Sequence, residues 1–237
     1  MPRDALRKSH VGITLNDQSS KMEDRLELAL SLVVAQIRDE SGLELERENT
    51  LALDELVDAL NRRYSDDLGG VNLERGFRQH ERTWLKPDGG FWYVKNWDGP
   101  RRWVLVAEAK RQGTRCAREV EGLPRQARGN AIERLGKNLR GFDALFLGEA
   151  ITPVVVFGEG CDFEPESSIL DRVATMNGFF PLNQVHVDKI NLAIGDTLKP
   201  VTMFFRHNAW TPGEMYGVLV DVTRRSIGYY RERYSLE

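Results

Sequence analysis

The chain has 237 residues, of which 41% are hydrophobic and 29% are charged, a composition typical of soluble globular proteins. No apolar run is long enough to span a bilayer, and the first residues lack the hydrophobic segment of a signal peptide. The two cysteines, Cys116 and Cys161, are too few and too widely spaced for a zinc site or a disulfide framework. We interpret them as free thiols and expect the protein in a reducing compartment, the cytoplasm.

Charge is unevenly distributed along the chain. The net charge is −3, which by itself argues against nucleic-acid binding. Residues 101–140, however, contain eleven Lys or Arg and only four Asp or Glu. This asymmetry indicates a basic face on an otherwise acidic body, although scattered surface arginines would give the same count.

The N-terminal part of the chain predicts a helical scaffold. Residues 1–21 are polar and unpatterned, and we expect a mobile arm there. Residues 22–40 place apolar side chains on one stripe, which predicts a helix. Asn49 or Thr50 is suited to cap a second helix over residues 51–63. We assign no chemistry to these helices and treat residues 1–237 as a single domain.

The pattern then changes to that of a β-hairpin. Residues 90–95 and 102–110 are two strand-like runs rich in aromatic and β-branched side chains, joined by a segment with strong turn signals. The second run is almost entirely apolar from Trp103 to Ala107. Such a strand is expected in the middle of a sheet, buried on both faces.

Alternating elements complete the prediction. We expect a basic loop over residues 113–124, helices over 125–142, 168–176 and 225–234, and strands over 151–157 and 215–223. Strands that alternate with helices predict an α/β layered fold, a central sheet flanked by helices.

Two acidic residues and a lysine meet at the ends of the predicted hairpin. Asp88 lies in a Pro-Asp-Gly-Gly turn at its start, and Glu108 and Lys110 end its second strand. Residues two apart on a strand point to the same face, so Glu108 and Lys110 project together. Carboxylates suit Mg²⁺, and a lysine can orient a water or balance the charge that develops during phosphodiester hydrolysis.

This spacing is not specific by itself. An acidic residue two positions before a lysine is common by chance and also fits an exposed ion pair at a strand end. The Pro-Asp-Gly turn favours a metal site because it supplies the second carboxylate. The carbonyl of Ala109 completes the predicted set of metal ligands, Asp88, Glu108 and Ala109.

A helix in the basic segment carries the second signal. On a helical wheel Ile132, Leu135 and Leu139 share one side, with Asn130, Arg134 and Lys137 opposite and Glu133 beside them. Asn can pair with adenine, Arg with guanine or phosphate, and Glu with an exocyclic amine. An amphipathic surface helix with ordinary charges would show the same pattern.

Several motifs in one order resemble the EcoRI family of restriction endonucleases. They are Pro87-Asp88-Gly89-Gly90, the stretch Trp103 to Gly113, Gly129 to Arg134 with Lys137-Asn138, Leu170-Asp171-Arg172 and Pro181-Leu182-Asn183. The resemblance runs from about Leu68 to Asn183. An ordered series of separate motifs is far more specific than any one of them.

The resemblance implies a PD-(D/E)XK fold and a bacterial homodimer that cuts palindromic double-stranded DNA with Mg²⁺ and leaves 5′ overhangs. It implies Asp88, Glu108 and Lys110 as catalytic residues, with Lys110 acting on the attacking water and phosphate rather than as the ion-pair partner of Glu108. A methyltransferase would protect the same DNA site. The residues expected to contact DNA are Gln112, Ala127, Gly129, Asn130, Ala131, Glu133, Arg134, Lys137 and Arg172.

Three functions remain open from the sequence. The first is a type II restriction enzyme for a site with an AATT core, with GAATTC as the best full site. Its outer base pair stays open because Ile169 stands where the family has an arginine, one turn before Arg172. The others are a DNA-binding protein without cleavage and a repair or recombination nuclease on the same fold.

Overall fold

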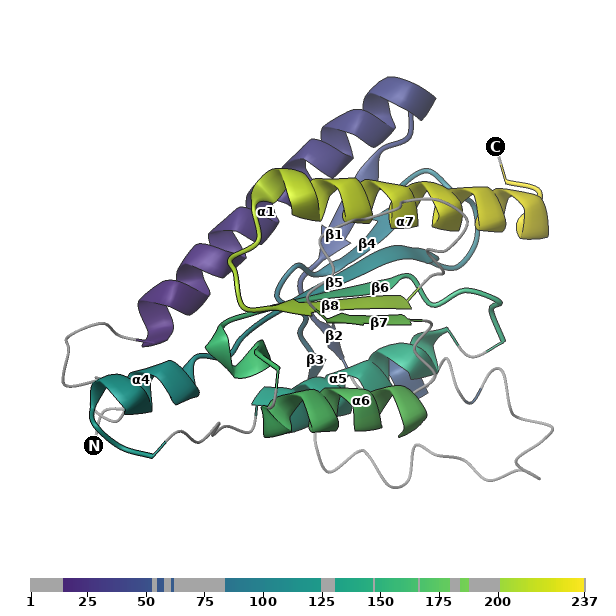
Figure 1. Cartoon of the computed structure of the whole chain (residues 1–237). Coiled ribbons are helices and arrows are strands. Elements are labelled where there is room, and N and C mark those ends of the chain that lie inside the picture. Colours follow the sequence, from purple (N-terminus) through teal and green to yellow (C-terminus); the bar gives the residue numbers. More distant parts are fainter. Residues whose placement is uncertain are drawn as a thin grey trace.

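A central six-stranded mixed sheet lies between two layers of helices in the computed structural model (Figure 1). The long helices α1 (Leu15–Ser41) and α7 (Pro212–Tyr234) cover one face, and α5 (Ala131–Leu145) and α6 (Ser168–Phe179) cover the other. The structure describes residues 15–52, 55–57, 61, 84–124, 131–146, 148–165, 167–179, 184–187 and 201–236.

The main sheet has the strand order β1-β4-β5-β6-β8-β7. Its strands are β1 (Leu45–Glu48), β4 (Phe91–Val94), β5 (Trp103–Arg111), β6 (Val154–Glu159), β7 (Gln184–Val187) and β8 (Val201–Arg206). The first three pair antiparallel, and β5, β6, β8 and β7 pair parallel. A separate antiparallel pair joins β2 (Leu51–Ala52) to β3 (Trp84–Leu85).

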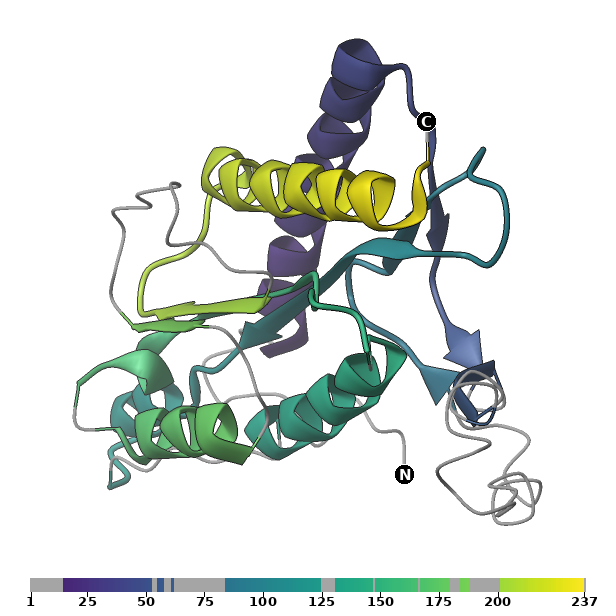
Figure 2. The ribbon, with the colours of Figure 1, turned by 90° about the vertical axis from the view of Figure 1, so that its right-hand side faces the viewer.

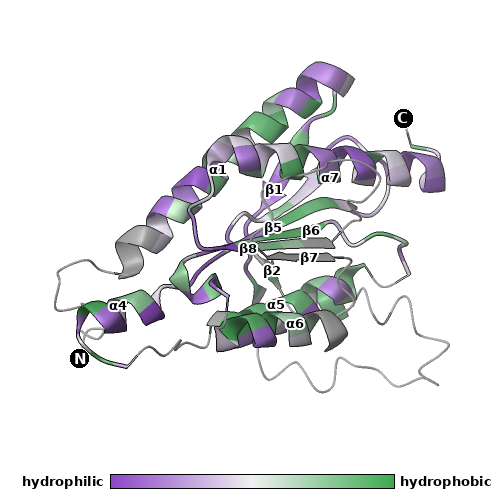
Figure 3. Cartoon of the chain, in the orientation of Figure 1, coloured by the Kyte–Doolittle hydropathy of each residue, from purple (hydrophilic) through white to green (hydrophobic). Residues whose placement is uncertain are grey.

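Two hydrophobic cores fill the spaces between the layers. One packs α1 and α7 on the sheet, with Leu105, Ala107 and Phe157 among its strand residues. The other packs α5 and α6 on the opposite face, around Val106, Val156 and Phe142. Figure 3 shows the consequence: the central strands are hydrophobic and the helices carry hydrophilic residues on their outer sides. Since β5 contributes to both cores, the strand that ends in Glu108 and Lys110 is held from both faces.

The α/β prediction is confirmed, together with the hairpin (now β4 and β5), the helix within α1, and the helix at residues 168–176. The predicted strand over 151–157 lies slightly later, as β6. The predicted helix over 125–142 is described from Ala131 onward as α5. The assignment of residues 1–237 to one domain stays a prediction.

Four local predictions are wrong. The expected arm overlaps α1, which already begins at Leu15; the helix expected from residue 51 begins instead as strand β2, although residues 55–57 and 61 are helical. The basic loop over 113–124 contains a short helix, α4 (Thr114–Val120). Residues 215–223 belong to α7 rather than to a strand, and the residues at helical spacing in this stretch are buried: Met215, Val218, Leu219 and Val222.

Helix α7 begins with local start signals that the strand prediction did not use. Thr211 caps it through a reciprocal capping box with Glu214, and Pro212 occupies its first turn. Figure 2 shows α7 crossing α1 over the sheet, so α1 and the sheet strands together cover its buried stripe. No helix in the described part of the chain is long and apolar enough to cross a membrane.

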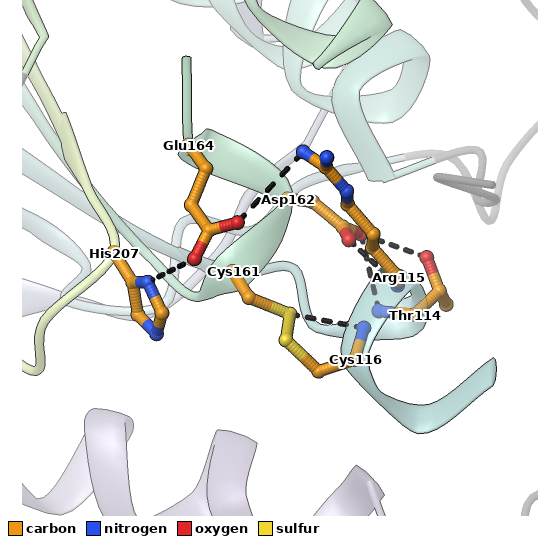
Figure 4. Close-up of a disulfide and its surroundings, with 7 residues drawn as sticks. All are labelled: Thr114, Arg115, Cys116, Cys161, Asp162, Glu164 and His207. Atoms are coloured by element: carbon orange, nitrogen blue, oxygen red, sulfur yellow. Dashed lines mark hydrogen bonds and ion pairs between the residues drawn. A yellow bond between two sulfur atoms is a disulfide. The ribbon is translucent and has the colours of Figure 1, made fainter. Parts of the chain in front are cut away.

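The interpretation of the cysteines as free thiols is also wrong, because Cys116 and Cys161 form a disulfide. Cys116 lies in α4 and Cys161 in the short 3-10 helix η3 (Cys161–Phe163), which follows β6 (Figure 4). Beside the disulfide, the buried carboxylate of Asp162 accepts hydrogen bonds from the backbone N–H groups of Thr114 and Arg115 at 3.1 and 2.7 Å. The start of α4 is thus attached to the segment after β6.

Candidate active site

The turn at residues 87–90 is pressed against strand β5. The N–H of Gly89 donates to the carbonyl of Ala107 at 2.9 Å, and a Cβ at Gly89 would lie 2.7 Å from the Cβ of Ala107. Gly90 has a φ of 77°, which favours glycine. These two glycines allow the backbone of Asp88 to approach β5 closely.

Asp88 makes three contacts with the end of β5. Its Oδ2 accepts from the Lys110 ammonium at 2.8 Å and from the N–H of Ala109 at 3.2 Å. Its own N–H donates to Oε2 of Glu108 at 3.0 Å. The turn and the strand end therefore form one hydrogen-bonded unit, as the hairpin geometry predicted.

Glu108 is fully buried, with 0% of its surface exposed. Besides Asp88, it contacts the Lys110 ammonium at 2.5 Å and accepts from the side-chain amide of Asn138 at 3.2 Å. Burial raises the pKa of Glu108, and Lys110 opposes this rise. A buried carboxylate is tolerated because each of its oxygens has a charged or hydrogen-bonding partner.

Lys110 lies between both carboxylates. Burial disfavours its charged form, but Glu108 and Asp88 outweigh this effect and the pKa of Lys110 is raised. The ammonium also donates to the carbonyl of Ala109 at 2.9 Å. The expectation that Lys110 is not the ion-pair partner of Glu108 is therefore wrong for this structure.

A cavity of about 170 Å³ opens in front of this cluster. It is lined by Ser19, Met22, Glu23, Asp88, Ala109, Lys110 and Arg111. Asp88 and Ala109 line this cavity, and the buried carboxylate of Glu108 accepts from the backbone N–H of Asp88; all three carry hard oxygens of the kind Mg²⁺ prefers. Among the described residues, no three Asp, Glu, His or Cys side chains gather into a fuller metal cluster. The residues present therefore offer oxygen ligands that are chemically suited to a magnesium ion.

Helix α5 packs its apolar stripe on the sheet and turns its charged side outward. Ile132, Leu135 and Leu139 are buried, whereas Glu133 and Arg134 are exposed. Glu133 pairs with Arg172 of α6 at 2.6 Å. The two predicted reading segments, α5 and α6, therefore meet at an exposed ion pair beside a shallow pocket between these helices.

The sequence model of the family described as "Restriction endonuclease EcoRI" matches residues 8–169 of this chain. The chain belongs to the EcoRI family. The matched segment contains β5, the Asp88 turn and α5, and it ends just before Arg172.

Two relatives agree with this assignment. The chain is 28% identical over 174 residues to the type II restriction enzyme RsrI of Cereibacter sphaeroides, in a match that covers 60% of this chain and 63% of RsrI. It is 41% identical over 96 residues to the type II restriction enzyme EcoRI of Escherichia coli, covering 37% of this chain and 35% of that enzyme. The chain thus matches less than two thirds of either relative's length.

The other residues of this EcoRI-family chain that we predicted to contact DNA differ in their exposure, and some lie outside the described residues. Gln112 is buried, with 4% of its surface exposed, and Lys137 is exposed on α5. Ala131 begins α5. Ala127, Gly129 and Asn130 lie outside the described residues.

The structure adds residues near the site of this EcoRI-family chain that the sequence did not suggest. Glu23 of α1 lines the cavity, and burial followed by the charge of Asp88 raises its pKa. Asn138 of α5 bonds directly to Glu108. Glu23 stands at an exposed position of α1, outside its apolar stripe, as an ordinary surface acid would, so no sequence signal distinguished it. Asn138 belonged to a quoted motif but had no role assigned.

Proposed function

We propose that this EcoRI-family chain is a type II site-specific deoxyribonuclease. It hydrolyses phosphodiester bonds in palindromic double-stranded DNA with an AATT core, with GAATTC as the full site, and leaves 5′ overhangs and 5′-phosphates. The observation that carries the proposal is the convergence of Asp88, Glu108 and Lys110 within hydrogen-bonding distance at the end of β5. The protein acts as a homodimer, and a methyltransferase protects the same DNA sites in the host.

The oxygens of Asp88, Glu108 and Ala109 would hold Mg²⁺. When bound, the ion lowers the pKa of an attacking water and offsets negative charge on the phosphate. Lys110 supplies the positive charge beside the cavity that stabilises charge developing in the transition state. Asp88 is anchored through its backbone N–H to Glu108, so the two carboxylates keep their relative position.

Sequence reading is assigned to the exposed side of α5 and the residues before it. Asn130, Glu133 and Arg134 contact the bases of the AATT core, and the extended stretch with Ala127 and Gly129 accompanies them. Lys137 suits phosphate, and Arg172 suits the outer base pair. The exposed pair of Glu133 and Arg172 supports this because both side chains occupy one accessible surface.

Digestion of a plasmid of known sequence in Mg²⁺, followed by mapping of the cut ends, tests the function. We expect cuts only at sites with one palindromic sequence containing AATT, each with a 5′ overhang. Cuts at many unrelated sequences would favour a repair nuclease, and binding of a GAATTC duplex without cleavage would favour a DNA-binding protein.

Glu108→Gln tests the assigned centre within that function. Gln keeps the volume and one acceptor oxygen but removes the charge, so we expect cleavage to be lost while DNA binding in Ca²⁺ is retained. Glu40→Gln, an exposed change on α1, serves as the matched control and should cut normally. Normal cleavage by Glu108→Gln would remove Glu108 from the active site.

A further inference from the structure

A row of charged side chains crosses the carboxyl ends of three parallel strands. The sheet register pairs Arg111 of β5 with Glu159 of β6, and Glu159 with Arg206 of β8. Paired residues of neighbouring strands lie on the same face of a sheet. Ligands of open α/β sheets commonly bind outside the carboxyl ends of parallel strands, so each member of this row is a candidate for contact with substrate.

Arg206 is fully engaged within the protein. Its guanidinium forms two hydrogen bonds with the carboxylate of Glu214, at 2.8 and 2.7 Å. It also donates to the carbonyls of Asn208 and Ala209 at 3.0 and 2.6 Å. Only 5% of its surface is exposed. Arg206 therefore joins β8 to α7 and has no role at the cavity.

The acidic members near Arg111 are also occupied. Glu159 is buried, accepting from Arg25 of α1 at 2.6 Å and from the N–H of Trp210 at 2.9 Å. Asp162, the other nearby carboxylate, accepts from the start of α4 at 2.7 and 3.1 Å. Neither carboxylate has Arg111 as its nearest partner.

Arg111 differs from Arg206, the other arginine of this row. Its Nε lies 3.7 Å from Glu159, beyond hydrogen-bonding distance, and within the described part of the chain its guanidinium donates no hydrogen bond. Its side chain is 20% exposed and lines the same cavity as Asp88 and Lys110. A half-buried guanidinium with open donors beside a catalytic cluster is suited to bind an incoming anion.

We propose that Arg111 binds a phosphate of the DNA backbone next to the cleaved bond, with Glu159 holding the arginine at the edge of the catalytic cavity. This rests on the proposed function, because that function brings DNA to the cavity. The planar guanidinium can donate two parallel hydrogen bonds to phosphate oxygens. Arg111 is then a substrate-binding residue, and Glu159 is a positioning residue.

The salt dependence of binding tests this contact. Affinity for a GAATTC duplex in Ca²⁺ is measured by fluorescence anisotropy over a range of salt concentrations for wild type, Arg111→Gln, Arg111→Lys and the control Arg224→Gln on α7. For Arg111→Gln we expect binding weaker by roughly 10-fold to 100-fold. The slope of log K against log salt should fall by about one for each protomer on the duplex. The control should behave as wild type.

Arg111→Lys keeps the charge next to Glu159 and loses the two-pronged geometry. We expect it to keep the wild-type salt slope, to bind several-fold more weakly, and to unfold at the wild-type temperature. It carries the test if Arg111→Gln proves unstable. Wild-type affinity in Arg111→Lys, or a wild-type salt slope in a folded Arg111→Gln, would overturn the proposal and leave Arg111 as a structural partner of Glu159.

Neutral methylphosphonates, placed one at a time around the cleaved bond, identify the phosphate. One position should weaken binding by wild type but not by the folded Arg111 variant, because the contact is already missing there. No such position would refute the inference. A wild type that binds no duplex would refute both the inference and the proposed function. Normal cleavage by wild type, together with Arg111 variants that bind DNA as wild type does, would refute the inference alone.

Discussion

Glu108 connects three segments of the chain through one buried carboxylate. The Asp88 turn, the strand itself through Lys110, and helix α5 through Asn138 each contribute a contact. The Asn138 contact joins a helix proposed to read DNA to a residue proposed to cut it. If α5 shifts when DNA binds, this hydrogen bond would transmit the shift to Glu108, so we expect Asn138 to position Glu108 for the reaction.

Asn138→Ala should slow cleavage with little effect on binding. Loss of one hydrogen bond to a charged group corresponds to about 1.5–3 kcal/mol, or roughly 10-fold to 100-fold in rate. Single-turnover cleavage in Mg²⁺ and affinity in Ca²⁺ separate the two effects. Lys137→Ala, its exposed neighbour, should instead weaken binding and leave the single-turnover rate unchanged. Wild-type cleavage by Asn138→Ala would show that the contact has no part in catalysis.

At the scale of elements, α7 is attached to the sheet through its first turn. Glu214 closes the capping box with Thr211 and accepts two hydrogen bonds from Arg206 at the end of β8. The hydrogen bonds from Arg206 lower the pKa of Glu214 to about 2 from an ordinary 4.5. This carboxylate stabilises the folded state only while it is ionised.

The attachment of α7 should weaken in acid. Because the folded-state pKa lies below the ordinary value, the stabilisation is present above pH 4.5 and is lost as the pH falls toward 2. The difference in melting temperature between wild type and Glu214→Gln should therefore be largest near neutral pH and shrink over that interval. A constant difference would contradict the assignment.

Asp143→Asn is a control for which the pH dependence of stability should have the opposite sign. Burial raises the pKa of Asp143 above its ordinary 3.8, so its contribution is present in acid and is lost as the pH rises. Wild type should lose stability relative to this variant with rising pH, opposite to the trend expected for Glu214→Gln.

At the scale of the whole molecule, two adjacent strand ends are joined covalently. Segments that follow β5 and β6 meet because these strands pair in parallel, and the disulfide links Cys116 to Cys161 across 45 positions of sequence. The link fixes α4, which lies between β5 and α5 in the chain. It restricts the unfolded chain as well as the folded one.

Reduction of the disulfide should lower global stability. A loop of this length corresponds to about 2–4 kcal/mol in the free energy of unfolding. Denaturant unfolding of wild type with and without a reductant measures the effect, and Cys116→Ser should unfold identically in both conditions. An unchanged midpoint for wild type on reduction would show that the cross-link contributes nothing to stability.

The amino-acid sequence alone determined features set by short-range periodicity. The Pro-Asp-Gly-Gly turn, the apolar strand ending at Lys110 and the apolar stripe of α5 each express a local pattern, and together they predicted the α/β fold and the meeting of Asp88, Glu108 and Lys110. The strand predicted over residues 215–223 is wrong because the β-branched side chains of this stretch favour a strand locally, whereas the stretch is part of α7. Packing against α1 and the sheet decides for the helix.

Only the tertiary structure decided which distant residues share the cavity. Glu23 and Arg111 line it together although they are far apart in sequence, because α1 crosses the sheet at the end of β5. The disulfide, the bond from Asn138 to Glu108 and the engagement of Lys110 by both carboxylates have the same origin. Side-chain periodicity records which way a residue faces within its own element, whereas these contacts depend on how separate elements are placed against one another.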